Sequence, residues 1–349
     1  MARLAATARL AGLAEAGLLP DALVRFGIRR MLAQRLRELA EPGVASPAAR
    51  QAFLDACRAG PIALVPDLAN EQHYEVPPTF FERVLGPHLK YSCCLWDTNG
   101  ATLADAEDRM LAQSCARAEI RDGMSVLDLG CGWGSLSLYV AERFPACRVL
   151  AVSNSKPQRE FILARAAHRG LANVTVVTAD VNHFEAKERF DRVVSIEMFE
   201  HVRNHEALLA RIAAWLAPDG RLFVHHFCHR DRAYPYEDAG PSDWMARHFF
   251  SGGMMPSEDW LLHFSRDLIA VDRWRVDGMH YARTSEAWLA NLDAQRTPLH
   301  PIFAAAYGER DAQRWIQRWR LFFLACAELF AHRGGSEWFV THQLFAPRQ

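Results

Sequence analysis

Hydrophobic and polar positions from residue 120 onwards alternate between two patterns. Short apolar runs predict buried strands, and the stretches between the first of them repeat apolar residues at three and four positions, as on one face of a helix. The predicted strands are Val126–Leu129, Arg148–Ser153, Val174–Thr178, Arg192–Ile196, Arg221–Phe227, Leu268–Val276 and Trp338–Ala346. The predicted helices are Ser135–Arg143, Lys156–Arg169 and His205–Leu216. This alternation predicts an α/β fold whose sheet is mainly parallel and joined by right-handed crossovers.

The chain before this region is predicted to be helical. Apolar residues spaced three and four apart predict amphipathic helices over residues 1–60, and Leu103–Ile120 is predicted to be one long helix. Pro77 and Pro78 impose extended backbone before a further helix. We therefore divide the chain into an N-terminal helical lid and substrate-covering segment, residues 1–115, and a core, residues 116–349. Insertions into the core are expected at about 229–265 and 278–335.

Composition limits the function classes. With 50% hydrophobic residues, 23% charged residues and a net charge of -1, the chain is globular and no nucleic-acid partner is expected. It has no apolar run long enough to predict a membrane span. Eight cysteines without a CxxC pair, and no signal peptide, indicate reduced thiols and a cytoplasmic location. The first residues carry Arg and no acid before Glu15, which leaves a transit peptide open.

A glycine-rich turn follows the first predicted strand. Gly130, Gly132 and Gly134 stand at alternate positions, two residues after Asp128, and lead into a helical pattern. Glycines let the backbone bend sharply and approach a ligand, because no Cβ obstructs it. The acidic residue and the GxGxG spacing differ from the dinucleotide-binding pattern. We interpret the turn as a site for S-adenosylmethionine (SAM), whose ammonium Asp128 would hold; an ordinary glycine-rich turn is the alternative.

The next two strand ends complete the predicted SAM site, since ligands of open parallel sheets lie beyond the carboxyl ends of the strands. The second strand ends at Ser153 and Asn154, followed by Gln158, so hydroxyl and amide groups replace the acid that usually binds a ribose. The third ends at Asp180 and Val181, which are predicted to hold the adenine. Helix capping is the alternative role of Asp180.

The fourth strand leads into candidate catalytic residues. A helix that begins near Glu197 would place Glu197, Glu200 and His201 on one face, toward the ligand crevice. Two carboxylates and an imidazole attract a cationic amine. An alkylamine is mostly protonated at neutral pH and cannot attack a methyl group until a base removes that proton, which one of these side chains would do. Helix capping by the glutamates is one alternative. Metal binding is a second, although methyl transfer needs no metal; its candidate ligands are His201, His205, His225, His226, Cys228 and His229.

Several motifs together resemble the family of cyclopropane fatty acid synthases, mycolic acid methyltransferases and plant coclaurine-type amine N-methyltransferases. They are Tyr74-Glu-Val-Pro, Tyr91-Ser-Cys-Cys, Leu127-Asp-Leu-Gly-Cys-Gly-Trp-Gly, Phe199-Glu-His, Trp319-Arg and Glu337-Trp-Phe. The resemblance implies the Rossmann-like class I methyltransferase sheet of seven strands, with the last two forming an antiparallel edge. It also implies SAM as methyl donor, S-adenosylhomocysteine (SAH) as product, no metal, and Tyr91 and Ser92 in the SAM site.

The branches of this family differ at one position. In the lipid cyclases a bicarbonate pocket, which falls here on Cys93, Glu200, His226 and Tyr281, receives a proton; these enzymes have Gly where this chain has Glu197. The amine enzymes have Glu there, and a second carboxylate favours a cation over bicarbonate. We therefore predict a SAM-dependent N-methyltransferase of a small-molecule amine, alkaloid-like or aralkyl. A cyclopropane synthase acting on unsaturated phospholipid acyl chains, and a noncatalytic SAM-binding protein, are the alternatives.

The substrate is expected under the N-terminal lid. Glu75 would attract the cation together with Glu197, and aromatic side chains would enclose the substrate. These aromatic candidates are Tyr74, Phe80, Phe81, Trp244, Phe249 and Tyr281. The apolar helices at both ends of the chain are open to two roles, either covering the crevice or pairing two subunits in a homodimer.

Overall fold

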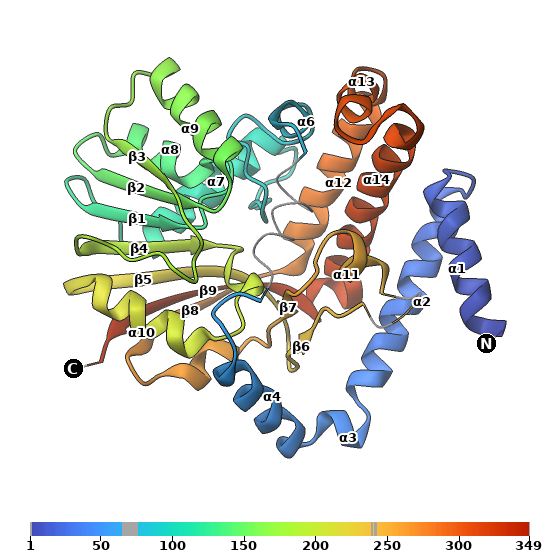
Figure 1. Cartoon of the computed structure of the whole chain (residues 1–349), viewed down its shortest axis with the longest axis horizontal. Helices are drawn as coiled ribbons and strands as arrows, with labels where there is room; N and C mark the ends of the chain where they lie inside the picture. Colours follow the sequence, from blue (N-terminus) through green and yellow to red (C-terminus); the bar gives the residue numbers. More distant parts are fainter. Residues whose placement is uncertain (1, 65–75, 239, 241–242, 349) are drawn as a thin grey trace.

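The computed structural model describes residues 2–64, 76–238, 240 and 243–348, with side chains from residue 9 onwards. Its main feature is a seven-stranded sheet (Figure 1) in the order β3-β2-β1-β4-β5-β9-β8. The five strands β3 to β5 are parallel, and β9 runs antiparallel to both β5 and β8. The strands are β1 Ser125–Leu129, β2 Arg148–Ser153, β3 Val174–Thr178, β4 Phe190–Ile196, β5 Leu216–His229, β8 Leu268–Val276 and β9 Trp338–Pro347. The predicted fold class is confirmed, and only β4 and β5 extend well beyond the predicted bounds.

Helices cover both faces of the sheet. The crossover helices α8 (Ser135–Arg143), α9 (Lys156–His168) and α10 (His205–Trp215) match the prediction closely. The helix α7, expected over Leu103–Ile120, is shorter and spans Leu103–Arg117. It ends because Glu119 takes a left-handed conformation with φ 54°, while the N–H groups of Glu119 and Ile120 bond back to Ala116 and Cys115. The carbonyls of the last turn are thereby satisfied without a glycine.

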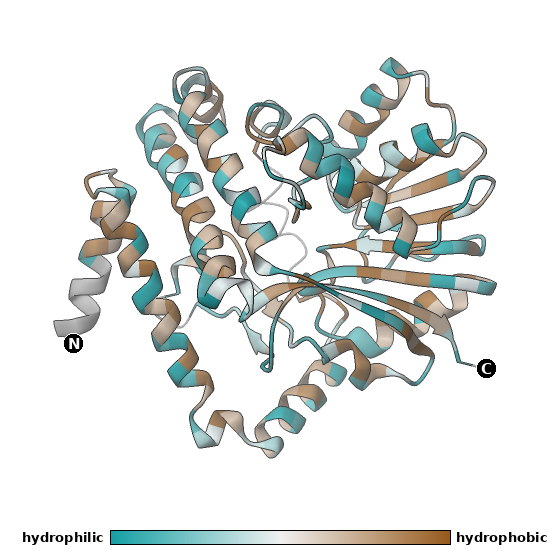
Figure 2. Cartoon of the chain, turned by 180° about the vertical axis from the view of Figure 1, so that it is seen from behind, coloured by the Kyte–Doolittle hydropathy of each residue, from teal (hydrophilic) through white to brown (hydrophobic). Residues whose placement is uncertain are grey.

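Two helical insertions follow the parallel strands. The first contains β6 (Tyr234–Pro235), α11 (Trp244–His248), β7 (Met254–Met255) and the 3-10 helix η2 (Trp260–Phe264). The second, between β8 and β9, contains α12 (Gly278–Ala294), α13 (Arg296–Tyr307), α14 (Glu309–Ala331) and the 3-10 turn η3 (His332–Gly335). Figure 2 shows apolar residues along the strands and along the inward sides of these helices. The helices therefore extend the core beyond the sheet rather than standing apart from it.

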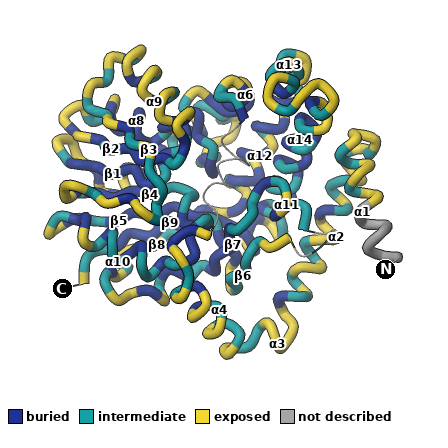
Figure 3. The backbone as a smooth tube through the Cα atoms, in the orientation of Figure 1, coloured by how far each residue is buried: buried dark blue, intermediate teal, exposed yellow. Residues whose placement is uncertain are grey.

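The N-terminal helices wrap around the outside of this body. They are α1 (Ala2–Glu15), α2 (Asp21–Leu39), α3 (Pro42–Ala45) and α4 (Pro47–Ala59), and α6 (Pro78–Val84) follows nearer the sheet. In Figures 1 and 3, α2 runs beside α14 and is largely exposed, whereas the central strands β1 and β4 are almost wholly buried. The helix α4 packs on α10. The chain that follows α4 then forms a bridge between Ala63 and Val202, beside the carboxyl edge of the sheet.

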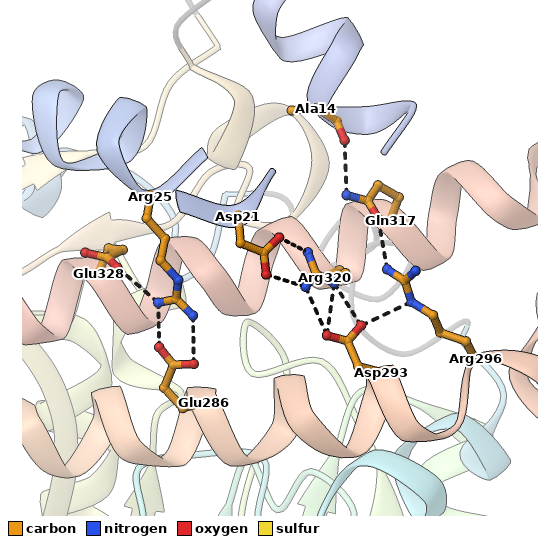
Figure 4. Close-up of polar contacts among 9 residues, drawn as sticks. All are labelled: Ala14, Asp21, Arg25, Glu286, Asp293, Arg296, Gln317, Arg320 and Glu328. Carbon is orange, nitrogen blue, oxygen red and sulfur yellow. Dashed lines mark hydrogen bonds and ion pairs between the residues drawn. The ribbon is translucent and has the colours of Figure 1, made fainter. Parts of the chain in front are cut away.

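Ion pairs fasten α2 to the second insertion (Figure 4). Arg320 of α14 lies between Asp21 of α2 and Asp293 of α12, with N···O distances of 2.5 and 2.8 Å. One turn further along α2, Arg25 bonds to Glu286 at 2.5 Å and to Glu328 at 3.0 Å. Both Arg groups are shared between carboxylates of two other elements, so they tie three helices together.

We expect Asp21→Asn to lower the free energy of unfolding by about 1 kcal/mol at low salt, less at high salt, because the pair is only partly shielded from water. The Arg320 hydrogen bond lowers the pKa of Asp21 below 3.8 in the folded chain. A depressed pKa gives its full stabilisation above the unfolded value, so the loss should be complete at pH 7, begin to shrink as pH falls through about 3.8, and vanish only below the lower pKa of the folded state. Denaturant titration checks this. The matched control is Asp311→Asn, also in the first turn of a helix but paired with Arg314 three residues away at 3.2 Å.

Candidate active site

A pocket opens at the carboxyl ends of the central parallel strands. Its wall includes most of the residues that the sequence predicts for a SAM site. Among them are Tyr91, Ser92, Asp128, Gly130, Gly132, Ser153, Asn154, Gln158, Asp180 and Val181. Glu197 and His201 stand on the same wall, and Ala63 reaches it from the N-terminal segment. One cavity thus joins the predicted cofactor residues to two of the three predicted catalytic residues.

Asp128, the last residue but one of β1, lines this pocket and is almost completely buried. Its Oδ2 accepts the hydroxyl hydrogen of Ser137 at 2.5 Å, and burial raises its pKa to about 6. A buried carboxylate with one hydroxyl donor is undercompensated, so a cation in the pocket would stabilise its ionised form. This environment suits the ammonium of SAM.

The glycine turn is built as the sequence implies. Gly130, Gly132 and Gly134 all have positive φ, at 86°, 52° and 79°. A Cβ at Gly130 would lie 2.5 Å from Met198, and one at Gly134 would lie 2.7 Å from Ile162, so neither position admits a side chain. A Cβ at Gly132 would meet no atom within 4 Å, although the residue lines the pocket. The backbone there is open to a ligand.

The second strand end offers unpaired hydrogen-bonding capacity. Ser153 donates to Oε1 of Gln158 at 2.6 Å, which leaves Nε2 of Gln158 buried and without a partner among the described residues. Ser135, also on the pocket wall, has a hydroxyl in the same condition. Buried donors are normally satisfied. Ligand hydroxyls or carboxylates would satisfy them, and these residues, the open glycine backbone and Asp128 fit SAM.

Asp180 does not cap a helix, which was the alternative role for it. Its Oδ1 accepts the Asn182 N–H at 2.8 Å in a turn after β3, and the structure places no helix there. The side chain of Asn182 bonds in turn to both backbone groups of Ala63, at 2.9 and 3.1 Å. The turn that carries Asp180 and Val181 is thereby tied to the N-terminal segment.

The expected helix at Glu197 is wrong. Glu197 has φ 49°, a left-handed conformation, and only Phe199–His201 form a short 3-10 helix, η1. The left-handed residue turns the Glu197 side chain back toward β5 and α12. Its Oε1 accepts the Cys93 N–H at 2.9 Å and His225 Nε2–H at 3.1 Å, and its Oε2 accepts the Tyr281 hydroxyl at 2.6 Å. The carboxylate is therefore held by three donors from three separate elements.

Glu200 is fully buried but far less well paired. Its Oε1 accepts the Phe227 N–H at 2.7 Å, and Oε2 has no partner among the described residues. Burial and the nearby Glu197 charge raise the pKa of Glu200 well above its usual range. Burial also raises the pKa of Glu197, whereas Lys90, the Cys93 N–H and Tyr281 lower it. Of the two carboxyl groups, Glu197 ionises first.

Two imidazoles complete the cluster. Burial lowers the pKa of both His201 and His226 to about 4, so both are neutral at pH 7. His226 donates from Nδ1 to the Phe227 carbonyl at 3.1 Å, and its Nε2 acceptor has no partner within the described ranges. The ring of His201 lies 4.4 Å from that of Phe250. Neutral imidazoles beside a raised-pKa carboxyl group are suited to accept or pass a proton.

The predicted aromatic enclosure is placed differently. Phe80, Phe81 and Phe249 are fully buried in the hydrophobic core around Trp319, and Trp244 donates to Glu15 of α1 at 2.7 Å. Tyr281 does lie at the cluster, stacked on Phe330 at 4.2 Å. Tyr74 and Glu75 lie outside the described residues.

Four residues that the sequence did not predict for the site lie near Glu197, Glu200 and His201. Phe227, Tyr236 and Phe250 form a chain of ring contacts beside His201 at 4.4 to 5.7 Å. Lys90 is buried, and its ammonium bonds to the Ser92 hydroxyl and the Cys93 carbonyl. The only early signal for Lys90 was its place beside the Tyr-Ser-Cys-Cys motif; the aromatic residues lie in a segment of irregular pattern.

The histidines and cysteines considered as metal ligands are not arranged around a common point in the described residues. His205 uses both ring nitrogens, with Nε2 on the Phe199 carbonyl at 3.0 Å and Nδ1 accepting from Trp260 at 3.1 Å. Across the part of the chain that the structure describes, no group of three His, Cys, Asp or Glu could hold a metal ion. Within the same described ranges, every helix is too short or too polar to cross a membrane.

Comparison with known proteins gives one consistent picture. The family model for mycolic acid cyclopropane synthetase matches residues 66–337. (S)-coclaurine N-methyltransferase of Thalictrum flavum subsp. glaucum is 40% identical over 95% of this chain and 93% of its own length. Cyclopropane-fatty-acyl-phospholipid synthase of Escherichia coli (strain K12) is 29% identical over 78% of this chain and 67% of its own. The crystal structure of coclaurine N-methyltransferase bound to N-methylheliamine and SAH superposes with a TM-score of 0.90 and 38% identity, covering 99% of both chains.

Proposed function

We propose that this chain, which belongs to the mycolic acid cyclopropane synthetase family, transfers a methyl group from SAM to the nitrogen of a hydrophobic small-molecule amine. The predicted resemblance is confirmed, and the chain is a SAM-dependent methyltransferase. The single observation that carries the choice of an amine is the Glu197–Glu200 pair. Two buried carboxyl groups beside one another favour a cation in the space next to them.

The residues around the pair would act on the amine in sequence. SAM would supply a methyl group bound to a positively charged sulfur, and Asp128 would hold its ammonium beside the glycine turn. Glu197 attracts the ammonium, and Glu200, assisted by His201, takes its proton; the raised pKa of Glu200 makes its ionised form a stronger base than an ordinary glutamate. The freed lone pair then forms the N–C bond as the C–S electron pair leaves on sulfur, which yields SAH. Positioning of the nitrogen in line with that bond supplies much of the rate.

Three aromatic side chains near the pair indicate the acceptor class. Phe227, Tyr236 and Phe250 offer apolar ring faces next to two carboxyl groups, a combination that suits an aralkyl or alkaloid-like amine. Three similar proteins are named as N-methyltransferases of coclaurine, pavine and tetrahydroprotoberberine, which are amines of this kind. The helices of residues 1–115 would cover the substrate as a lid.

A lipid cyclase is the second candidate, because Cys93, Glu200, His226 and Tyr281 are all present in the cluster. Two of these four, however, already serve Glu197: the Cys93 N–H and the Tyr281 hydroxyl both donate to its carboxylate. Donors used in this way are not available to bicarbonate, and the negative charge of Glu197 would repel it. The geometry therefore supports the amine reaction better.

Subunit pairing and location stay proposals. Leu10, Leu23 and Phe26 are more than half exposed on α1 and α2, and an apolar face of this kind would suit a homodimer. All eight cysteines lie in the described ranges and none forms a disulfide, which supports a cytoplasmic location.

The test is to incubate the enzyme with SAM that carries an isotopic label in its methyl group, together with a panel of aralkyl amines and with vesicles of unsaturated phospholipid. We expect the label on an amine nitrogen, located by mass spectrometry, and none in the acyl chains. Label in the lipid, or in no member of a broad panel, would contradict the proposal. The Asp128→Asn protein serves as the control for transfer that does not depend on the SAM site.

A further inference from the structure

A row of buried polar side chains runs behind Glu197, away from the pocket. Nε2 of His225 on β5 lies 3.1 Å from Oε1 of Glu197, and Nδ1 of His225 lies 2.8 Å from Nε2 of His342 on β9. Nδ1 of His342 lies 2.8 Å from a guanidinium nitrogen of Arg117, the last residue of α7. Both histidines are fully buried, and they are direct partners in the β5–β9 register.

The Arg117 end fixes the direction of every hydrogen bond in this row. A guanidinium only donates, so Nδ1 of His342 must accept. The single ring hydrogen of neutral His342 then lies on Nε2 and is donated to Nδ1 of His225. His225 in turn carries its hydrogen on Nε2 and donates it to Glu197. Burial lowers the pKa of both histidines well below the usual value, in keeping with neutral rings.

A proton exit from the site does not fit this geometry. Passing a proton outward would require Arg117 to accept one at the far end, and a guanidinium has no acceptor. The row can act only in the opposite sense, presenting a donor to Glu197. Arg117 is half-buried, with its guanidinium 5.1 Å from the ring of Trp274, and so anchors the row from the outer side of the sheet.

We propose that Arg117, His342 and His225 are positioning residues that set both imidazole tautomers and hold Glu197 as an ionised hydrogen-bond acceptor facing the amine. The inference rests on the proposed function, because it assigns Glu197 the recognition of the cation. If these contacts served only to pair the ring nitrogens of the two buried imidazoles, the hydrogen bonds could run in either direction. Here the order of donors means that the distant Arg117 guanidinium fixes the ring hydrogen of His225 on the nitrogen that faces Glu197. A donor at this position favours the charged form of the Glu197 carboxylate.

Other groups around Glu197 act on the same equilibrium and stay constant in the test. They are Lys90 and Cys93 of the 90–94 loop, Glu200 and His201 of η1, His226 of β5, Tyr281 of α12 and Cys326 of α14. None of them contacts Arg117 through a hydrogen bond described for that residue. The described hydrogen-bond path from Arg117 to Glu197 therefore runs through the two histidines.

Nitrogen-15 NMR of the histidine rings and infrared titration of Glu197, taken as the difference from Glu197→Gln, test the proposal without substrate. We expect His225 and His342 as Nε2–H tautomers. In Arg117→Met, His342 should become a tautomer mixture, and the acid dissociation constant of Glu197 should fall about three- to tenfold, because a donor to the charged form is lost. Arg117→Lys should restore most of both signals.

The matched control is Arg275→Met, which removes an Arg that lies over the Phe339 ring on the same sheet and pairs with Glu258. It should leave both readouts unchanged. An Nδ1–H proton on His342 in the native protein, or an unchanged Glu197 titration in folded Arg117→Met, would overturn the inference. Failure to methylate any amine would overturn the proposed function alone, since neither spectroscopic signal depends on turnover.

Discussion

Glu200→Gln is expected to lower kcat for the cognate amine by about 10²- to 10⁴-fold, the range over which a general base contributes. Glutamine keeps the size of the side chain and an acceptor for the Phe227 N–H, but it cannot take the proton of an ammonium. SAM affinity should stay within about twofold, because Glu200 is absent from the wall of the SAM pocket. His201→Ala is expected to give a smaller loss of the same kind.

Initial rates over a series of pH values, with calorimetric SAM binding, check this result. In the native enzyme kcat/KM should fall on the acid side with an apparent pKa above 4.5, because a raised pKa means that Glu200 takes up its proton at a higher pH than usual. Glu200→Gln should lack that limb. Glu337→Gln is the control, since Glu337 is equally buried but bonds to Arg333 near η3. Turnover unchanged in Glu200→Gln would remove this carboxyl group from the chemistry.

Asp128→Asn should weaken SAM binding by about 10- to 150-fold, equivalent to about 1.5–3 kcal/mol for a hydrogen bond to a charged partner. The cause is the loss of a negative charge that is buried beside a bound ammonium, where water screens it poorly. Calorimetry with SAM and with SAH measures it directly, and both ligands should lose affinity because both carry the ammonium.

Ser137→Ala separates charge from geometry in this test. It removes the hydroxyl that donates to Asp128 at 2.5 Å but leaves the charge, so it should cost less than Asp128→Asn. Equal SAM affinity in the native protein and Asp128→Asn would contradict the assignment of Asp128 to the ammonium.

The sheet was predictable because its strands are local apolar runs separated by helices of regular spacing. The departures arise where a residue other than glycine takes a left-handed conformation. Glu119 ends α7 in this way, and Glu197 replaces the expected helix start, at φ 54° and 49°. Such conformations are uncommon outside glycine and leave no signal in the pattern. They are held by tertiary contacts, as the three donors to Glu197 show.

The site followed the same division. Most of the residues predicted to bind SAM stand at successive strand ends, so their convergence on one pocket is a property of the parallel sheet and was accessible from sequence. His342 and Arg117 are 225 positions apart in the chain and meet only because β9 inserts beside β5. Phe227, Tyr236 and Phe250 likewise converge through an insertion of irregular pattern. The roles proposed for these residues could therefore be inferred only from the structure.

Glu197, on the pocket wall, and the adjoining buried Glu200 are proposed to make the site selective for a cation. Calorimetry in the presence of SAH, comparing a bicyclic tertiary amine with its uncharged carbon isostere, tests it without turnover. We expect the amine to bind at least about tenfold more tightly than the isostere to the native enzyme, and Glu197→Gln to remove most of this preference. Equal affinity for the two ligands in the native enzyme, or an undiminished preference in Glu197→Gln, would contradict it.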